Sequence, residues 1–208
     1  MARALVGPVC RLCRRERMKL FLKGPKCETM KCPVERKPYP PGQHGRGRIR
    51  ESEYLLQLRE KQKARRIYGL LEKQFRNLYG KAASEKGITG ENLLRMLEQR
   101  LDNVVCRANF ASSRNQARQF VRHGHINVNG KRVTIPSYQL RKGDVVEVAP
   151  KAQSMIVMRH NLDTLDRAIP AWLDASPSDF KVTVRELPVR EQIDVPVREQ
   201  LIVELYSK

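Results

Sequence analysis

The chain lacks the features that mark membrane-spanning, exported and most catalytic proteins. It contains no run of about eighteen consecutive apolar residues, which excludes an ordinary transmembrane helix. Residues 1–8 form too short and too weakly apolar a stretch for the core of a signal peptide. We recognise no internal repeat, low-complexity segment, conventional catalytic triad or open metal site. We therefore expect a cytoplasmic, non-enzymatic protein with no membrane and no small-molecule substrate among its partners.

Acidic residues are also scarce. The 208 residues include 41 Lys and Arg but only 22 Asp and Glu, a net charge of +19. The excess is confined to residues 1–160, because residues 161–208 hold 6 basic and 9 acidic groups. Cations that neutralise phosphates release condensed counterions, so a polyanion is the expected partner. The first 160 residues should build the nucleic-acid surface.

Five cysteines make an odd count, and four of them lie within the first 32 residues. Cys10 and Cys13 are separated by two residues, and Cys27 and Cys32 by four. This spacing is typical of a closed four-thiolate Zn²⁺ site with a structural role in a reducing compartment. An iron–sulfur cluster uses the same ligands, and free thiols are a third reading. Cys106 lies in an apolar stretch and should be a small buried hydrophobe.

Apolar spacing divides the chain into an arm, a helical middle and a region with strands. Residues 7–50 are rich in Cys, Pro, Gly and basic residues and lack apolar periodicity. Helical spacing starts after Ser52, a plausible N-cap like Thr89, and glycines mark the expected helix ends. The apolar positions are Tyr54, Leu55, Leu58, Phe75, Leu78, Tyr79, Leu93, Leu94, Leu97 and Leu101, and the glycines are Gly69, Gly87 and Gly124.

After His125 the apolar period changes to two. Asn129-Gly130 between two short alternating runs predicts a hairpin, because both central residues of a type I′ turn need positive φ. We expect further strands at 145–148, 181–184 and 201–206, and a helix over 154–167.

A short helix before this hairpin carries a row of arginines. Ser113 to Gln116 is typical of a capping box, followed by an apolar stripe of Ala117, Phe120 and Val121. Arg114, Arg118 and Arg122 recur every four residues beside that stripe, where guanidinium groups can bind phosphates bidentately. A solvated charged face is the alternative. The hairpin adds His123, Lys131 and Arg132, so cations from two elements should converge.

Several motifs in this region resemble the small RNA-binding module named after the fourth protein of the small ribosomal subunit. They are Leu97 to Leu101, Ser113-Arg-Asn-Gln-Ala-Arg118, Val121-Arg-His-Gly-His-Ile126, Val128-Asn-Gly-Lys131 and Lys142-Gly-Asp144. The module also occurs in pseudouridine synthases, some aminoacyl-tRNA synthetases and a ribosome-rescue heat-shock protein.

Motifs in the rest of the chain narrow the resemblance to the bacterial family of small-subunit protein four in its zinc-binding form. These are Gly7 to Cys13, Tyr39-Pro-Pro-Gly-Gln-His-Gly45, Leu58 to Lys63, Arg66 to Gly69, Gln74-Phe-Arg76, Arg100-Leu-Asp-Asn-Val104 and Glu199 to Ser207. The resemblance implies binding to a junction in the 5′ domain of small-subunit rRNA and early action in subunit assembly. It also implies proximity to messenger RNA where it enters the subunit, contacts with small-subunit proteins three and five, and an influence on decoding accuracy. Some members repress their own messenger.

We predict an α+β protein with three parts: a metal-binding arm over residues 1–50, a helical domain over 51–97 and 161–208, and an RNA-binding module over 98–160. The module should contain two helices and a small antiparallel sheet, and the tail should fold back onto the helical domain. The predicted metal ligands are Cys10, Cys13, Cys27 and Cys32. The predicted RNA-binding residues are Arg11, Arg14, Arg15, His44, Arg46, Arg48, Arg50, Arg59, Lys61, Lys63, Arg65, Arg66, Arg76, Arg114, Gln116, Arg118, Arg122, His123, Lys131 and Arg132.

Two other function classes compete with a structural ribosomal role. Arg100-Leu101-Asp102 mimics the catalytic Arg-Leu-Asp of pseudouridine synthases, but Gln99 stands where those enzymes usually have Gly, and the tripeptide lies at the beginning of the module instead of following it in a large separate domain. We expect Asp102 to be a helix-surface carboxylate that pairs with an arginine or accepts backbone hydrogen bonds. A ribosome-associated rescue or regulatory factor is the second alternative, disfavoured by the large helical middle.

Overall fold

The computed structural model describes residues 7–47 and 50–207, and the chain divides into two compact units. One unit comprises the described residues of 1–93 and 195–208, and the other comprises residues 94–194. The boundary falls within helix α5 (Thr89–Glu98). No helix in the described residues has the length and hydrophobicity needed to cross a membrane.

The first unit is helical, as the apolar spacing predicted. Its other elements are α1 (Cys10–Glu16), the 3₁₀ turn η1 (Gly24–Cys27), α2 (Pro33–Arg36), α3 (Glu53–Ile67), α4 (Glu72–Ser84) and α10 (Glu199–Tyr206). Ser52 caps α3 by accepting a hydrogen bond from the Leu55 backbone N–H. Phe75 is fully buried, whereas Tyr54, another of the predicted apolar positions, is 59% exposed.

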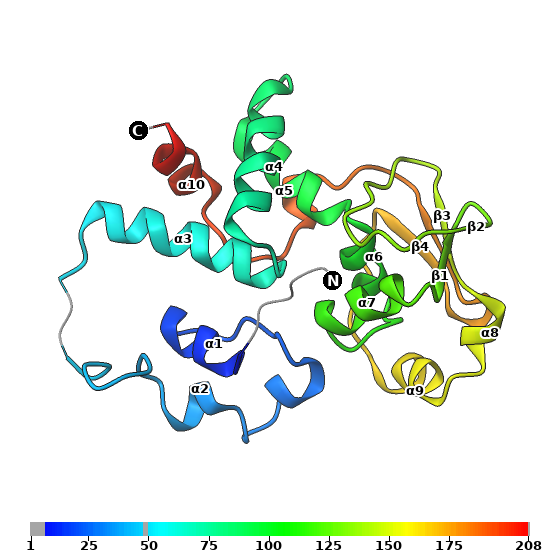
Figure 1. Cartoon of the computed structure of the whole chain (residues 1–208), viewed down its shortest axis with the longest axis horizontal. Helices are drawn as coiled ribbons and strands as arrows, with labels where there is room; N and C mark the ends of the chain where they lie inside the picture. The colour runs from blue at the N-terminus through cyan, green and yellow to red at the C-terminus, as the bar shows by residue number, and fades with distance from the viewer. Residues whose placement is uncertain (1–6, 48–49, 208) are drawn as a thin grey trace. The chain divides into compact units, whose positions relative to one another are not determined.

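The predicted strand at 201–206 is wrong, because these residues lie in α10, which packs on α3 (Figure 1). Ile202 and Tyr206 are four residues apart, so a helix places both on one face toward the unit. Ile202 is fully buried, and the Tyr206 ring stacks on Tyr79 with centroids 4.5 Å apart. Packing has overridden the strand propensity of a β-branched sequence.

The second unit combines helices with one antiparallel sheet. Its helices are α6 (Leu101–Arg107), α7 (Arg114–Arg122), α8 (Pro150–Gln153), α9 (Ile156–Thr164) and the 3₁₀ turns η2 (Pro177–Asp179) and η3 (Arg190–Gln192); its strands are β1 (Ile126–Val128), β2 (Lys131–Arg132), β3 (Val145–Val148), β4 (Leu173–Ser176) and β5 (Lys181–Val184). The strand order is β2-β1-β3-β5-β4. Asn129 and Gly130 both have positive φ, 50° and 74°, as the predicted hairpin requires.

The sheet extends beyond the predicted module of residues 98–160. β5 pairs with β3 in antiparallel register, with Val182 opposite Val146, and β4 adds the outer edge. Residues 161–194 therefore belong to the same compact unit as the predicted module and not to the helical unit. Only the end of the predicted tail, the segment that contains α10, folds back onto the helical unit.

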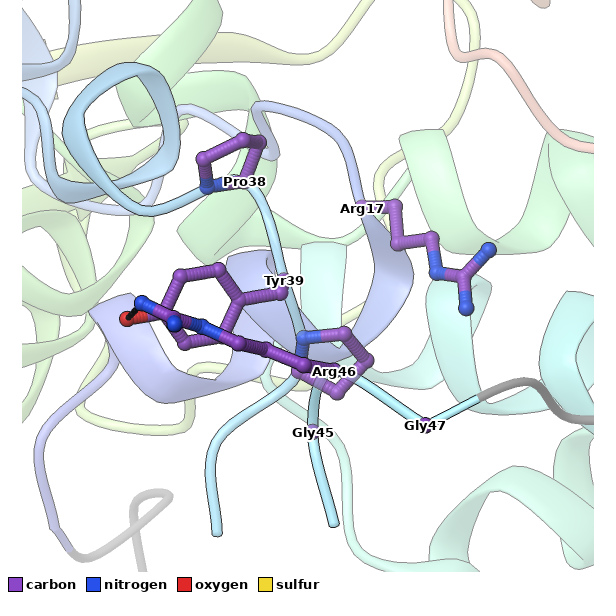
Figure 2. Close-up of a pocket in the computed structure, with 7 residues that line it drawn as sticks. Arg17, Pro38, Tyr39, Gly45, Arg46 and Gly47 are labelled. Carbon is purple, nitrogen blue, oxygen red and sulfur yellow. Dashed lines mark hydrogen bonds between the residues drawn. The ribbon is translucent and has the colours of Figure 1, made fainter. Parts of the chain in front are cut away.

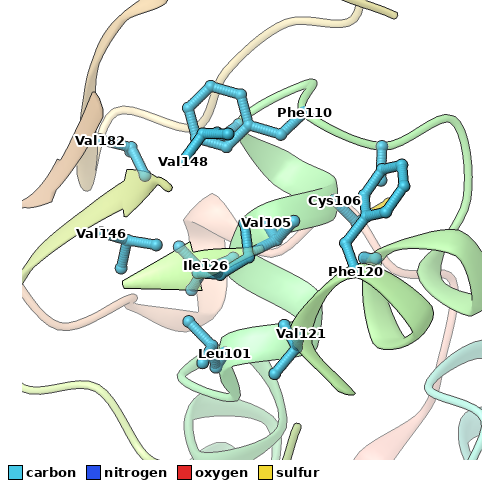
Figure 3. Packing of buried hydrophobic residues seen from close by; sticks show 14 of the residues in the cluster. Leu101, Val105, Cys106, Phe110, Phe120, Val121, Ile126, Val146, Val148 and Val182 are labelled. Carbon is cyan, nitrogen blue, oxygen red and sulfur yellow. The ribbon is translucent and has the colours of Figure 1, made fainter. Parts of the chain in front are cut away.

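One apolar core joins α6, α7 and the sheet of this unit (Figure 3). Val105 and Phe110 are fully buried, and Phe120 is 6% exposed. Cys106 is buried in the same cluster, as expected for a small hydrophobe. The core holds α7 on the sheet and thereby fixes where its polar side chains emerge.

Candidate nucleic-acid interface

Exposed cations of the second unit gather where α7 ends and the hairpin begins. The Ser113 hydroxyl caps α7 by accepting from the Gln116 N–H at 3.4 Å, and the helix ends at Arg122. The exposed cationic side chains here are Arg122, His123, Lys131 and Arg132. Arg132 Nη2 donates to the His123 carbonyl oxygen at 3.2 Å, which ties the hairpin to the helix end. Two elements thus present cations to one surface, as predicted.

The same surface contains two histidine rings in edge contact. The centroids of His123 and His125 are 5.9 Å apart. Burial lowers the pKa of His125, and the neighbouring His123 and Arg132 lower it further. A proton on His125 is thus disfavoured first by burial and then by the two neighbouring basic side chains.

The predicted arginine row does not act as one surface. Arg118 is 8% exposed, and its Nη1 lies 3.7 Å from Oδ2 of Asp102. Arg114 is half-buried, and its Nε donates to Oδ1 of Asn103 at 2.7 Å. Arg122 is exposed at the last helical position. Four residues are slightly more than one turn of an α-helix, so residues four apart do not lie directly above one another. Each arginine of the row therefore has different surroundings.

Gln116 likewise faces the protein. Its Oε1 accepts hydrogen bonds from the Ser112 backbone N–H at 2.6 Å and the Ser112 hydroxyl at 2.7 Å. It also accepts from Nδ2 of Asn161 at 3.2 Å. The side chain thus binds Ser112 instead of completing the predicted capping box with Ser113.

Asp102 is buried, 4% exposed, and is not the helix-surface carboxylate that we expected. The predicted pairing with an arginine is correct, because Arg100 donates to both of its oxygens, at 3.0 and 2.6 Å. A carboxylate held by two arginines away from solvent cannot reach an RNA base. The geometry therefore removes the group on which the pseudouridine synthase reading depends.

The five predicted cations between residues 59 and 66 all form ion pairs within the helical unit. The pairs are Arg59–Glu16, Arg66–Glu16, Lys61–Glu72, Arg65–Glu72 and Lys63–Glu60. The Glu16 side chain is only 1% exposed, so two cations of α3 hold a buried carboxylate of α1. These residues neutralise acidic partners and attach α1 and α4 to α3.

The arm places two arginines, a half-buried one and an exposed one, beside one aromatic ring. Arg14 and Arg46 place their guanidinium carbons 5.0 and 4.7 Å from the centroid of Tyr39. Nε of Arg14 donates to the carbonyl oxygens of Lys37 and Tyr39, at 3.1 and 3.0 Å, so this predicted contact residue anchors the loop. Among the other predictions, Arg11, His44, Arg46, Arg50 and Arg76 are exposed and Arg15 is half-buried, while Arg48 lies outside the described residues.

The four clustered cysteines lie on neighbouring elements. Cys10 and Cys13 are on α1, Cys27 ends η1, and Cys32 caps α2, which packs against α1. Burial raises the pKa of Cys13 and Cys27, and the adjacent thiols raise it further. The backbone N–H of Lys23 points to Sγ of Cys27 at 3.4 Å, the type of contact that favours a thiolate. Within the described residues, however, no three Cys, His, Asp or Glu side chains are grouped as metal ligands.

Two residues of the arm were absent from the predicted site. Arg17 and Tyr39 line a hollow together with Arg46 (Figure 2). The interleaving of basic residues with a tyrosine near a Pro-Gly turn was the available signal. Arg17 ends α1 with a left-handed backbone, φ 55°, a conformation that local spacing does not reveal.

Comparisons with known proteins agree with this geometry. Residues 99–146 match the model of the S4 domain, and residues 4–98 match that of the ribosomal protein S4/S9 N-terminal domain. Fold and site thus define an α+β protein built on an S4 domain. Small ribosomal subunit protein uS4 of Acidothermus cellulolyticus is 61% identical over 211 residues, covering 100% of both chains. The uS4 proteins of Frankia alni and Anaeromyxobacter sp. strain K are each 59% identical, over 97% and 96% of this chain and 98% and 97% of theirs.

The chain belongs to the small ribosomal subunit protein uS4 family. The resemblance to the family of small-subunit protein four is therefore confirmed, whereas its zinc-binding form stays a prediction. Full-length similarity to ribosomal proteins also favours the structural reading over the enzymatic one.

Proposed function

We propose that this chain is a structural component of the small ribosomal subunit that binds rRNA directly in the cytoplasm. Family membership and similarity over nearly the whole chain support this role for the entire protein. The single observation that carries RNA binding is the meeting of exposed cations from two elements, Arg122 on α7 and Arg132 on β2. A-form RNA is contacted through phosphates, 2′-hydroxyls and shape, which suits a cationic surface of this kind.

The exposed members of the predicted set are the proposed primary contacts. They are Arg11, His44, Arg46, Arg50, Arg76, Arg122, His123, Lys131 and Arg132. Arg118 and Gln116 are proposed to position α7 from within, and the paired cations of α3 to hold the helical unit together. Arg48 remains a candidate from the sequence.

The finer roles rest on the family resemblance. We infer that the rRNA target is a junction of the 5′ domain and that binding nucleates subunit assembly. Small-subunit proteins three and five, and messenger RNA where it enters the subunit, are the proposed neighbours, and decoding accuracy is the property that they would influence.

We also propose that Cys10, Cys13, Cys27 and Cys32 hold one structural Zn²⁺. Four thiols on adjacent short elements have the donor chemistry for a closed zinc site, and nearby lysines and arginines offset the charge of four thiolates. When bound, zinc would link α1, η1 and α2 without taking part in a reaction.

RNA selectivity tests the central proposal. The full chain is titrated into the small-subunit 5′-domain junction and into an unrelated duplex of similar length, at several salt concentrations. We expect preference for the junction and an affinity that falls linearly with salt on logarithmic axes. Equal affinity for the two RNAs would instead identify a general RNA-binding protein.

A further inference from the structure

The hollow in the arm has the chemistry of a nucleotide site. It has a volume of about 500 Å³ and is lined by Arg17, Pro38, Tyr39, Pro40, Gly45, Arg46 and Gly47. Two cations and no carboxylate line it. A second hollow of about 170 Å³ shares Arg17 and Pro40, but it is lined by Glu16, Glu51 and Glu60 among its cations. Of these two hollows, the first is therefore the one suited to a polyanion.

Arg46 is held flat against an aromatic ring inside this hollow. Its guanidinium carbon lies 4.7 Å from the Tyr39 centroid, and its Nη2 donates to the Tyr39 hydroxyl at 3.4 Å. The hydrogen bond from Arg46 lowers the pKa of Tyr39, consistent with a positive environment. Figure 2 shows the Arg46 side chain lying along the Tyr39 ring, while the Arg17 side chain lies on the other side of the view and points away from that ring. Stacking on the ring already restricts the rotamers of Arg46. The side chain therefore loses less conformational entropy on binding a ligand than a freely rotating arginine would.

The backbone of the loop keeps this platform open. A Cβ atom on Gly45 would lie 1.9 Å from the carbonyl oxygen of Pro40. Only glycine therefore permits the backbone at residue 45 to lie this close to the backbone of Pro40. Arg14 fixes the Tyr39 segment from α1 through two carbonyl oxygens. The ring and the guanidinium are thus positioned before any ligand arrives.

We infer that this hollow binds one unpaired nucleotide of the rRNA, with its base stacked on the Arg46 guanidinium and its phosphate paired with Arg17. Arginine planes and aromatic rings are the usual stacking partners of unpaired bases. Arg17 is exposed and lines the same hollow, so its guanidinium is available to the phosphate of a nucleotide whose base lies on Arg46. This inference rests on the proposed binding of small-subunit rRNA and adds a base contact to it.

Four variants of the full chain separate stacking from charge. Arg46→Lys keeps the charge but lacks the plane, and Tyr39→Leu removes the ring beneath it. Arg17→Gln removes the phosphate partner. Lys81→Gln, an exposed residue of α4, removes one charge of the same unit away from the hollow and is the matched control. Affinity for small-subunit rRNA is measured at several salt concentrations, and base accessibility is mapped by chemical probing.

We expect the parent to protect at least one unpaired base that Arg46→Lys and Tyr39→Leu leave accessible, with about tenfold weaker binding and an unchanged salt slope. Arg17→Gln should reduce the salt slope by about one unit, whereas Lys81→Gln should retain every protection. Unchanged protections in the Arg46→Lys and Tyr39→Leu proteins overturn the inference, even if Arg17→Gln binds more weakly. A parent protein that shows no preference for the rRNA would contradict the proposed function instead.

Discussion

Arg100 holds Asp102 through two hydrogen bonds, Nε to Oδ1 at 3.0 Å and Nη2 to Oδ2 at 2.6 Å, although only one residue separates them. Arg118 approaches the same carboxylate from α7 at 3.7 Å. All three residues are at most 8% exposed, so one buried charge cluster joins the start of α6 to the middle of α7. The position of the exposed end of α7 depends on this cluster.

Arg118 and Arg122 should therefore respond differently to the same substitution. Arg118→Gln removes one cation from a buried carboxylate that keeps Arg100, so the free energy of unfolding should fall by about 1–3 kcal/mol. Arg122→Gln should leave stability within about 0.5 kcal/mol and reduce the salt slope of rRNA binding by about one unit. Denaturant unfolding and RNA titrations on the same samples provide both quantities. An unchanged salt slope in Arg122→Gln would exclude that residue from the contact set.

Phe120 should stabilise the module through packing alone. Phe120→Ala opens a cavity between α7 and the sheet, which should cost about 3 kcal/mol or more and weaken RNA binding only as a consequence. Ile156→Ala is the control, because Ile156 is 84% exposed and its truncation should change stability by less than about 0.5 kcal/mol. Equal losses in the two variants would contradict the observed packing. Thermal unfolding followed by circular dichroism measures both.

The clustered cysteines should bind one zinc ion per chain. Elemental analysis of the purified protein distinguishes zinc from iron, and Cys27→Ser should lower the metal content and expose residues 7–45 to proteolysis. Cys106→Ser is the matched control, because Cys106 lies in the core of the other unit. Full metal content and unchanged protection in Cys27→Ser would exclude the four-cysteine site.

The stability of the module should depend on pH through His125. Burial lowers its pKa below the ordinary value of 6.5 in the folded state, so the unfolded chain binds the proton more tightly. The stability contribution is therefore complete above pH 6.5 and declines as the pH falls through that value toward the lower folded pKa. His125→Gln should flatten the thermal unfolding profile between about pH 7.5 and pH 5.5. A profile with the same slope in both proteins would show that other groups cause the change.

Much of the fold follows from local signals. Ser52 and Ser113 cap the helices that they were expected to begin, and Asn129-Gly130 adopts the two positive φ values of the predicted hairpin. These signals are reliable because they reflect backbone sterics and nearby hydrogen bonds. The strand predicted over 201–206 was wrong because the apolar residues of this segment suit a strand as well as a helix. Packing against Tyr79 and α3 favours the helix.

The sequence by itself determined the class of partner, the family, the helical character of residues 52–124 and the hairpin that follows them. Only the tertiary structure decided which cations face outward, because that depends on acidic partners that arrive from distant positions. Glu16 pairs with Arg59 and Arg66, which lie 43 and 50 residues further along the chain. Asp102 likewise withdraws Arg118 from an otherwise regular row. Spacing along a helix predicts which residues share a face. A buried carboxylate pairs with the guanidinium that folding brings beside it, so the tertiary structure decides which arginine becomes buried.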